Sequence, residues 1–207
     1  MSVRGEASVR AEPDEALLWI TLTALEATPG EALSDVSTRS NTLVAMLDGL
    51  GVAKGDRATT GVSVHEEFDH SPKGRRSLGH RAVSRVTVRL TDHQLIGRLV
   101  TQTTQELAAR VDGPRWQIAP DNPVHLEAAR LAAAHAELKA RAYAEGVGAE
   151  LGPLLRLAEP EDSVVMARRS AAFQPFAAAG APESMPIEAG EYEVTASIQA
   201  AFALRLD

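Results

Sequence analysis

Residues 193–205 read Glu-Val-Thr-Ala-Ser-Ile-Gln-Ala-Ala-Phe-Ala-Leu-Arg, and this stretch decides the fold class. Its apolar positions are Val194, Ala196, Ile198, Ala200, Phe202 and Leu204, and the positions between them are mostly polar. Because successive side chains of a strand point to opposite faces, this period of two predicts a long strand with one buried face. A face of this kind needs a layer of helices or a second sheet to cover it.

Similar patterns predict further strands along the chain. The expected strands span residues 2–11, 15–26, 62–68, 81–90, 113–119 and 152–158. Residues 12–14, Glu-Pro-Asp, form the expected corner between the first two strands. In the second strand Leu18 and Ile20 share one face while Leu17 and Trp19 share the other, so both of its faces are expected to be partly covered.

Three helices are expected between these strands. Thr28-Pro29-Gly30-Glu31 has the form of a capping box, and the helix that it starts is expected to end near Gly51. Asp92 is expected to cap a second helix that reaches Leu107. Asn122-Pro123 opens the third and longest helix, which ends near residues 146–148. Leu131, His135, Leu138 and Ala142 are expected to line one side of that helix, and its many alanines permit a neighbour to approach closely.

The element order is therefore β-β-α-β-β-α-β-α-β-β, in which paired strands dominate over strict β-α alternation. This order predicts an α+β fold with a largely antiparallel sheet and about three helices packed on it. The 207 residues suit a single domain, 1–207, or a two-lobed unit. Residues 159–190 are rich in Pro, Ala and Gly without a clear period, and we expect them to form a long flexible loop.

Composition excludes several classes of function. The formal charge is −7, which argues against nucleic acid as a partner, because phosphate binding needs a concentrated positive face. The absence of cysteine excludes disulfides, thiolate catalysis and Cys-based zinc sites. No apolar run has the length of a signal peptide or a membrane span, so we expect a cytoplasmic protein, or a periplasmic or secreted one if this is a mature form recloned with a new methionine.

The densest group of potential metal ligands lies in the predicted hairpin, within residues 65–70, His-Glu-Glu-Phe-Asp-His. On a strand His65, Glu67 and Asp69 would share one face, and His80 would lie near them across the hairpin. Nitrogen and oxygen ligands of this kind suit zinc or another divalent ion. The alternative is a solvated strand face that runs into a polar tip, and the absence of a recognised ligand spacing favours it.

No motif for catalysis is found, so we expect no catalytic residues, no cofactor and no enzymatic activity. The serines lack the G-x-S-x-G context of a nucleophile, and Gly49-Leu50-Gly51 reads as a helix end and not as a phosphate loop. The loop residues Arg168, Arg169, Phe173 and Phe176 are candidates for an interaction site, since arginine and aromatic side chains are enriched at protein interfaces.

Four ordered segments of the chain resemble the SIMPL family, also called DUF541. They are Val3-Arg4-Gly5-Glu6-Ala7 with Ala11-Glu12-Pro13-Asp14; residues 47–52 with Gly55-Asp56; the strand from Arg81 to Leu90; and residues 127–130 through 140–142 with Glu145-Gly146-Val147-Gly148 and Leu151-Gly152. The resemblance implies an α+β fold, no established enzymatic activity, and relatives best known as periplasmic or surface-antigen proteins, some of which form large ring-like oligomers.

These observations favour a non-enzymatic interaction or scaffold protein that self-associates, since long regular strands leave edges that partner subunits can cover. We therefore expect a homo-oligomer with a possible further protein partner. The second hypothesis is a protein that binds a small molecule or a divalent metal through the hairpin around His65–His70.

Overall fold

The computed structural model describes residues 1–71, 74–160, 166–169 and 188–206. The chain divides into two compact units, each with its own sheet. We call the described residues within 1–14, 118–169 and 189–206 the sheet A unit, and those within 15–117 the sheet B unit. Among the described residues, no helix combines the length and the apolar character needed to cross a membrane.

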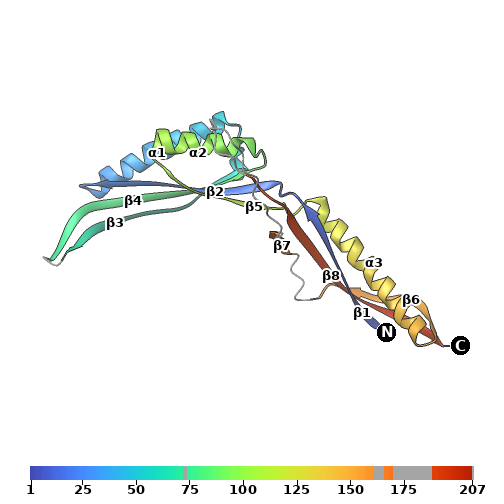
Figure 1. The fold of residues 1–207 in the computed structure, drawn as a ribbon. Coiled ribbons are helices and arrows are strands. Elements are labelled where there is room, and N and C mark those ends of the chain that lie inside the picture. Colours follow the sequence, from blue (N-terminus) through green and yellow to red (C-terminus); the bar gives the residue numbers. More distant parts are fainter. Residues whose placement is uncertain (72–73, 161–165, 170–187, 207) are drawn as a thin grey trace, which may run out of the picture. The chain divides into compact units, whose positions relative to one another are not determined.

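The sheet A unit places one long helix on an antiparallel sheet (Figure 1). Its strands are β1 (Ser2–Ala11), β6 (Ala149–Ala158), β7 (Met166–Arg169) and β8 (Tyr192–Leu206), and its helix is α3 (Pro123–Gly146). Strand β8 lies between β1 and β6, and β7 pairs with the start of β8. The alternation predicted for β8 is confirmed from Val194 to Phe202, since Val194, Ala196, Ile198, Ala200 and Phe202 are all buried under α3, whereas Leu204 is 40% exposed.

The sheet B unit has four antiparallel strands in the order β3-β4-β2-β5, with two helices on one face (Figure 1). The strands are β2 (Glu15–Glu26), β3 (Arg57–Ser71), β4 (Gly74–Leu90) and β5 (Arg110–Gln117). The helices are α1 (Pro29–Gly49) and α2 (Gln94–Leu107), and a short 3-10 turn, η1 (Lys54–Asp56), precedes β3. The side chains of Leu18, Ile20 and Leu22 are fully buried on the covered face of β2.

The helix starts follow the capping signals of the sequence. Thr28 accepts a hydrogen bond from the Glu31 backbone, and the Glu31 carboxylate accepts one from the Thr28 backbone, so the capping box of α1 is confirmed. Asn122 caps α3 through a 2.9 Å bond from the Val124 amide. For α2 the cap position is His93, one residue later than predicted, although Asp92 still accepts from the Gln94 amide.

The buried face of α3 differs from the expected one. Leu131 and Leu138 are exposed, and the stripe that packs on sheet A consists of Ala128, Ala132, Ala136, Ala140 and Ala144. These alanines recur every four residues and face β1 at Gly5, where the helix comes so close that a Cβ atom on Gly5 would meet the Ala136 Cβ at 2.7 Å. Because larger side chains do not fit this spacing, the leucines turn outward.

Two further features were not foreseen. The consecutive strands β1 and β2 belong to different sheets, so residues 12–14 separate two sheets and do not join neighbouring strands. The predicted loop 159–190 contains the four-residue strand β7, and most of that segment lies outside the described residues. Otherwise the α+β class, the antiparallel pairing and the order of elements are confirmed.

Candidate functional site

The hairpin of β3 and β4 does not bring the four metal-ligand candidates together. His65 lies opposite Arg81 and Glu67 lies opposite Gly79, whereas His80 lies opposite Glu66. Directly paired residues share a face of the sheet, so His80 projects from the other side of the hairpin than His65 and Glu67. The expectation that His80 joins these residues is therefore wrong, because the register shifts the two histidines to opposite faces.

The Glu67 carboxylate forms an ion pair with Arg81. Nη2 of Arg81 donates to its carboxylate at 2.7 Å, and Nε of Arg81 donates to the second oxygen. The hydrogen bond from Arg81 lowers the pKa of Glu67, so the carboxylate stays charged and paired. Among the residues that the structure describes, no group of three or more His, Asp or Glu side chains is arranged to hold a metal ion.

Most described histidines make structural contacts. Nδ1 of His135 lies 2.6 Å from the Glu6 carbonyl oxygen and 3.2 Å from the Glu6 amide nitrogen, and Nε2 of His125 donates to the Ala119 carbonyl at 3.0 Å. His80 contacts the Ala27 carbonyl at 3.2 Å, and the His93 ring packs edge-on against Trp116 with centroids 4.6 Å apart. A carbonyl can only accept, so His80 and His125 each donate a ring N–H to the backbone, and His135 is held by the backbone of Glu6.

The predicted interaction residues of the 159–190 segment are only partly described. Arg168 and Arg169 lie on β7, opposite Glu193 and Tyr192 of β8. Phe173 and Phe176 lie outside the described residues. A role for these four residues in binding stays a prediction.

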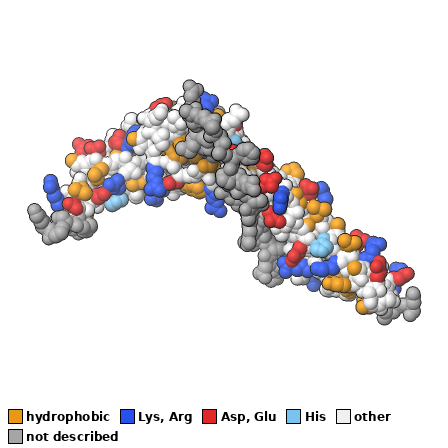
Figure 2. All heavy atoms as spheres, viewed as in Figure 1, with side chains coloured by type: hydrophobic (Ala, Val, Ile, Leu, Met, Phe, Trp, Pro, Cys, Tyr) orange, Lys and Arg blue, Asp and Glu red, His pale blue; other side chains and the backbone are white. Residues whose placement is uncertain are grey.

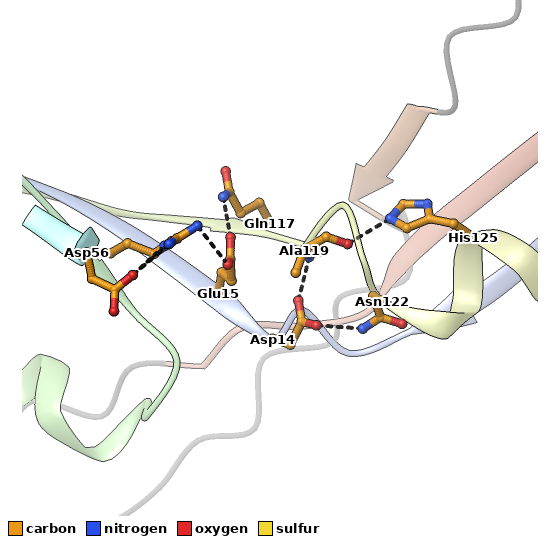
Figure 3. Close-up of polar contacts among 8 residues, drawn as sticks. Asp14, Glu15, Asp56, Gln117, Ala119, Asn122 and His125 are labelled. Atoms are coloured by element: carbon orange, nitrogen blue, oxygen red, sulfur yellow. Dashed lines mark hydrogen bonds and ion pairs between the residues drawn. The ribbon is translucent and has the colours of Figure 1, made fainter. Parts of the chain in front are cut away.

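A polar cluster around Asp14 lies in the sheet A unit (Figure 3). One carboxylate oxygen of Asp14 accepts from the Ala119 amide at 2.7 Å, and the other accepts from Nδ2 of Asn122 at 2.6 Å. Burial raises the pKa of Asp14, but the hydrogen bonds from Ala119 and Asn122, together with smaller contributions from its own backbone amide and His125, hold the pKa below its ordinary value. Asp14 thus joins the end of β1 to the segment that enters α3.

A second cluster, also drawn in Figure 3, lies in the sheet B unit. The Glu15 side chain is almost fully buried and accepts from Nε2 of Gln117 at 2.6 Å. Arg89 lies 3.4 Å from Glu15 and 2.6 Å from Asp56, so one guanidinium serves two carboxylates. Every member of the cluster has a partner, which is the arrangement of a structural network that fastens η1 to the sheet.

Replacing Asp14 with asparagine is expected to reduce the pH dependence of folding. A carboxyl whose pKa is lower in the folded protein contributes stability above its ordinary pKa of 3.8 and loses it as the pH falls through the lower folded value. The variant should lose about 1 kcal/mol at pH 7 and less at pH 3. Urea unfolding at both pH values, followed by far-UV circular dichroism, measures the difference. The exposed Asp121→Asn serves as the control, and an unaltered pH profile in Asp14→Asn would contradict the assignment.

A groove of about 790 Å³ runs between α3 and β6 in the sheet A unit. Its floor is Ala200 and Phe202 of β8, and Leu151, Leu154 and Leu157 of β6 form one wall. The opposite wall is α3, where Glu137 and Arg141 form an ion pair at 2.8 Å on the rim. Apolar side chains reach the surface over α3 and beside β6 (Figure 2). The groove is therefore apolar inside and charged at its rim.

The leucines of β6 are more exposed than an ordinary strand would leave them. Leu154 is 51% exposed, Leu155 67% and Leu157 55%, and the pairing of β6 with β8 shifts register on both sides of Leu154. The sequence pattern predicted the strand but not this apolar edge. The signal for it was present, since Leu151, Leu154, Leu155 and Leu157 crowd one short strand without the charged alternation of the other strands.

Comparison with known proteins gives the family. The family model described as "SIMPL: Protein of unknown function (DUF541)" matches residues 1–202. The chain belongs to the SIMPL family. Two relatives are each named "26 kDa periplasmic immunogenic protein", one from Brucella melitensis biotype 1 and one from Brucella abortus strain S19. Each relative is 25% identical to this SIMPL protein. The matched region covers 99% of the SIMPL protein described here and 84% of the relative's length.

Proposed function

We propose that this SIMPL protein is a non-enzymatic interaction protein that associates with copies of itself through the β6 edge of sheet A. The observation that carries the proposal is the exposure of Leu154, Leu155 and Leu157 on a strand that pairs with β8 alone among the described residues. Exposed apolar edge strands promote pairing with another chain. A second subunit on this edge would remove the leucines from water.

The two outer strands of sheet A contrast in a way that supports this edge. On β1 the exposed residues are Ser2, Arg4, Glu6, Ser8 and Arg10, all polar or charged. Charged side chains discourage pairing along an edge, and apolar ones favour it. The charged β1 edge therefore resembles an edge strand that is protected from pairing with another chain. The apolar β6 edge resembles an edge strand that a partner covers.

The non-enzymatic part of the proposal is supported by what the titratable groups do. His80, His93, His125 and His135 contact backbone carbonyls or a ring, and Glu67 pairs with Arg81. Asp14 accepts two hydrogen bonds, and Glu15 accepts one from Gln117 and lies at ion-pair distance from Arg89. Groups used in this way hold the fold together and leave little capacity for proton transfer.

The change Leu154→Glu with Leu157→Glu is expected to convert the oligomer into a 22.0 kDa monomer. Burying one leucine contributes about 1.5–3 kcal/mol. Losing two per subunit should therefore weaken association by at least about 100-fold. Light scattering coupled to size-exclusion chromatography at micromolar concentration measures the mass.

Val62→Glu provides the matched control, because Val62 is 61% exposed on a strand of the sheet B unit. It should keep the mass of the unaltered protein. A monomeric unaltered protein at micromolar concentration would contradict self-association, and an unchanged mass in the double variant would place the interface elsewhere.

We also propose a periplasmic location, the second of the two locations expected from the sequence. The names of both Brucella relatives contain the word periplasmic, which supports this location. Fractionation of the source cells tests it, and recovery of the protein with cytoplasmic markers would refute it.

A further inference from the structure

Sheet B has a second face, turned away from α1 and α2. Leu17, Trp19 and Thr21 of β2 project there, since they alternate with Leu18 and Ile20, which are buried under the helices. All three are half-buried and lie in the middle of the sheet. Lys and Arg side chains gather along this side of the sheet B unit (Figure 2).

Trp19 is surrounded by four arginines. Directly paired residues share a face, so the partners of Leu17 and Thr21 on both flanking strands stand around Trp19. At all four positions the partner is an arginine: Arg85 and Arg110 lie opposite Thr21, and Arg89 and Arg115 lie opposite Leu17. Thr87 and Asp112 lie directly opposite Trp19 itself, so the face presents one large aromatic ring with an arginine at each of its four diagonal positions.

Two of these four arginines pair with carboxylates, and the other two have no such partner in the part of the chain that the structure describes. The paired ones are Arg110, which pairs with Asp112 at 2.9 Å, and Arg89, which pairs with Asp56 at 2.6 Å and with Glu15 at 3.4 Å. Arg85 and Arg115 are exposed, and within the described ranges no carboxylate lies at ion-pair distance from either. The uncompensated positive charge thus sits at two opposite corners, on either side of Trp19.

The register sets the spacing of these two charges. Arg85 and Arg115 are two strands apart and, counted along β2 from Thr21 to Leu17, four residues apart. With strands about 4.8 Å apart and a rise of about 3.3 Å per residue, their Cα atoms are about 16 Å apart. Residues i and i+4 of an extended chain lie on one side about 13 Å apart, and the reach of an arginine side chain covers the difference.

We propose that the open face of sheet B binds an extended acidic segment of a partner protein, with the pattern acidic-x-apolar-x-acidic. The two carboxylates would pair with Arg85 and Arg115, and the apolar side chain between them would rest on Trp19. Planar guanidinium groups suit carboxylates, and Trp and Arg are the side chains most enriched where partners bind tightly. This surface lies in a different unit from the β6 edge and concerns a different partner, so it goes beyond self-association.

Charge favours an acidic peptide over a nucleic acid. A nucleic acid strand places a negative charge at every nucleotide and needs a continuous basic track. On this face Asp112 and Glu67 interrupt such a track, and the whole chain carries a formal charge of −7. A ligand with two separated negative charges matches Arg85 and Arg115, which have no carboxylate partner among the described residues, without opposing the paired carboxylates.

The test uses the full chain and a fluorescein-labelled peptide with the core Glu-Thr-Leu-Thr-Glu, followed by fluorescence anisotropy. Binding of this peptide is expected, with an accompanying change in tryptophan emission. Exposed ion pairs contribute about threefold each to affinity, so Arg85→Ala with Arg115→Ala should weaken binding about tenfold. A scrambled core, Glu-Glu-Leu-Thr-Thr, should bind at least about threefold more weakly, because only one carboxylate then reaches an arginine.

Arg98→Ala is the matched control, since Arg98 is also exposed but lies on α2, on the helix side of the same sheet. It should leave binding unchanged. Equal binding of the two cores, or unchanged binding in the double variant, would overturn the proposal. Tighter binding of a single-stranded oligothymidine than of the peptide would also overturn it. If the peptide does not bind and the double variant changes in oligomeric mass, the face belongs to an interface with a second copy of this chain, and the proposal is wrong.

Discussion

Replacing Gly5 with valine is expected to destabilise the sheet A unit by about 3 kcal/mol or more, the upper range for overpacking a core. A Cβ atom on Gly5 would overlap the Ala132 carbonyl oxygen and lie 2.7 Å from both the backbone nitrogen and the Cβ of Ala136. Two of these atoms belong to the helix backbone, which cannot move aside as a flexible side chain can. The strand would have to leave α3, and the alanine stripe would lose its packing.

The two units carry different reporters for this experiment. Both tryptophans, Trp19 and Trp116, lie in the sheet B unit, and both tyrosines, Tyr143 and Tyr192, lie in the sheet A unit. In urea unfolding, Gly5→Val should therefore shift the tyrosine and far-UV circular dichroism transitions and leave the tryptophan emission midpoint in place. Gly146→Ala is the control in the same unit, because a Cβ atom there meets nothing within 4 Å. A Gly5→Val protein as stable as the Gly146→Ala control would show that α3 does not pack as described.

Replacing Arg39 with alanine is expected to destabilise the sheet B unit by about 2–4 kcal/mol, since a hydrogen bond to a charged group contributes about 1.5–3 kcal/mol. Arg39 of α1 donates to the Thr23 carbonyl at 2.6 Å and to the Leu107 carbonyl at 3.0 Å. The Thr23 carbonyl lies on β2 beyond the last residue that pairs with β5. The Leu107 carbonyl lies in the last turn of α2, where backbone carbonyls have no amide partner within the helix. One side chain thus satisfies acceptors from two other elements.

Tryptophan emission measures this effect, because the sheet B unit holds both tryptophans. Arg39→Lys is the informative second variant. Lysine keeps the charge but lacks the guanidinium fork, so it should bond one carbonyl and recover about half of the loss. Full recovery by lysine would mean that the charge beside Asp35 matters and the two carbonyl bonds do not.

The elements with local signals were predictable from the sequence. The Thr28–Glu31 capping box and the Asn122-Pro123 start are chemical signals within four residues, so the starts of α1 and α3 follow from them. The alternation from Val194 to Phe202 likewise predicted the buried face of β8. In each case the information lies in neighbouring residues, and no distant contact is needed to read it.

Features that depend on distant residues were not predictable in this way. The buried side of α3 was assigned to Leu131 and Leu138, because hydrophobicity ranks leucine above alanine. The actual side is chosen by Gly5, more than a hundred residues away, which admits only alanine. Strand register is equally non-local, and it separated His80 from His65 and Glu67 although their spacing in the sequence suggested a cluster.

The two proposed surfaces show the same limit. The sequence shows that Leu154 and Leu157 lie on a strand, but their exposure follows from the position of β6 at the border of sheet A. Trp19 was expected on the second face of β2, and the arginines around it become neighbours only through pairing with β4 and β5. Sheet order therefore decides both candidate sites.

The pairing of Glu15 with Gln117 has a consequence for how this protein can be divided. Residues 15–117 begin and end as directly opposed strand partners, about 5 Å apart. A segment with adjacent ends meets the geometric condition for an inserted module, since a short turn can close the gap that its removal leaves. The same geometry suits it for grafting into a loop of another protein, where its own sheet and two helices would travel together.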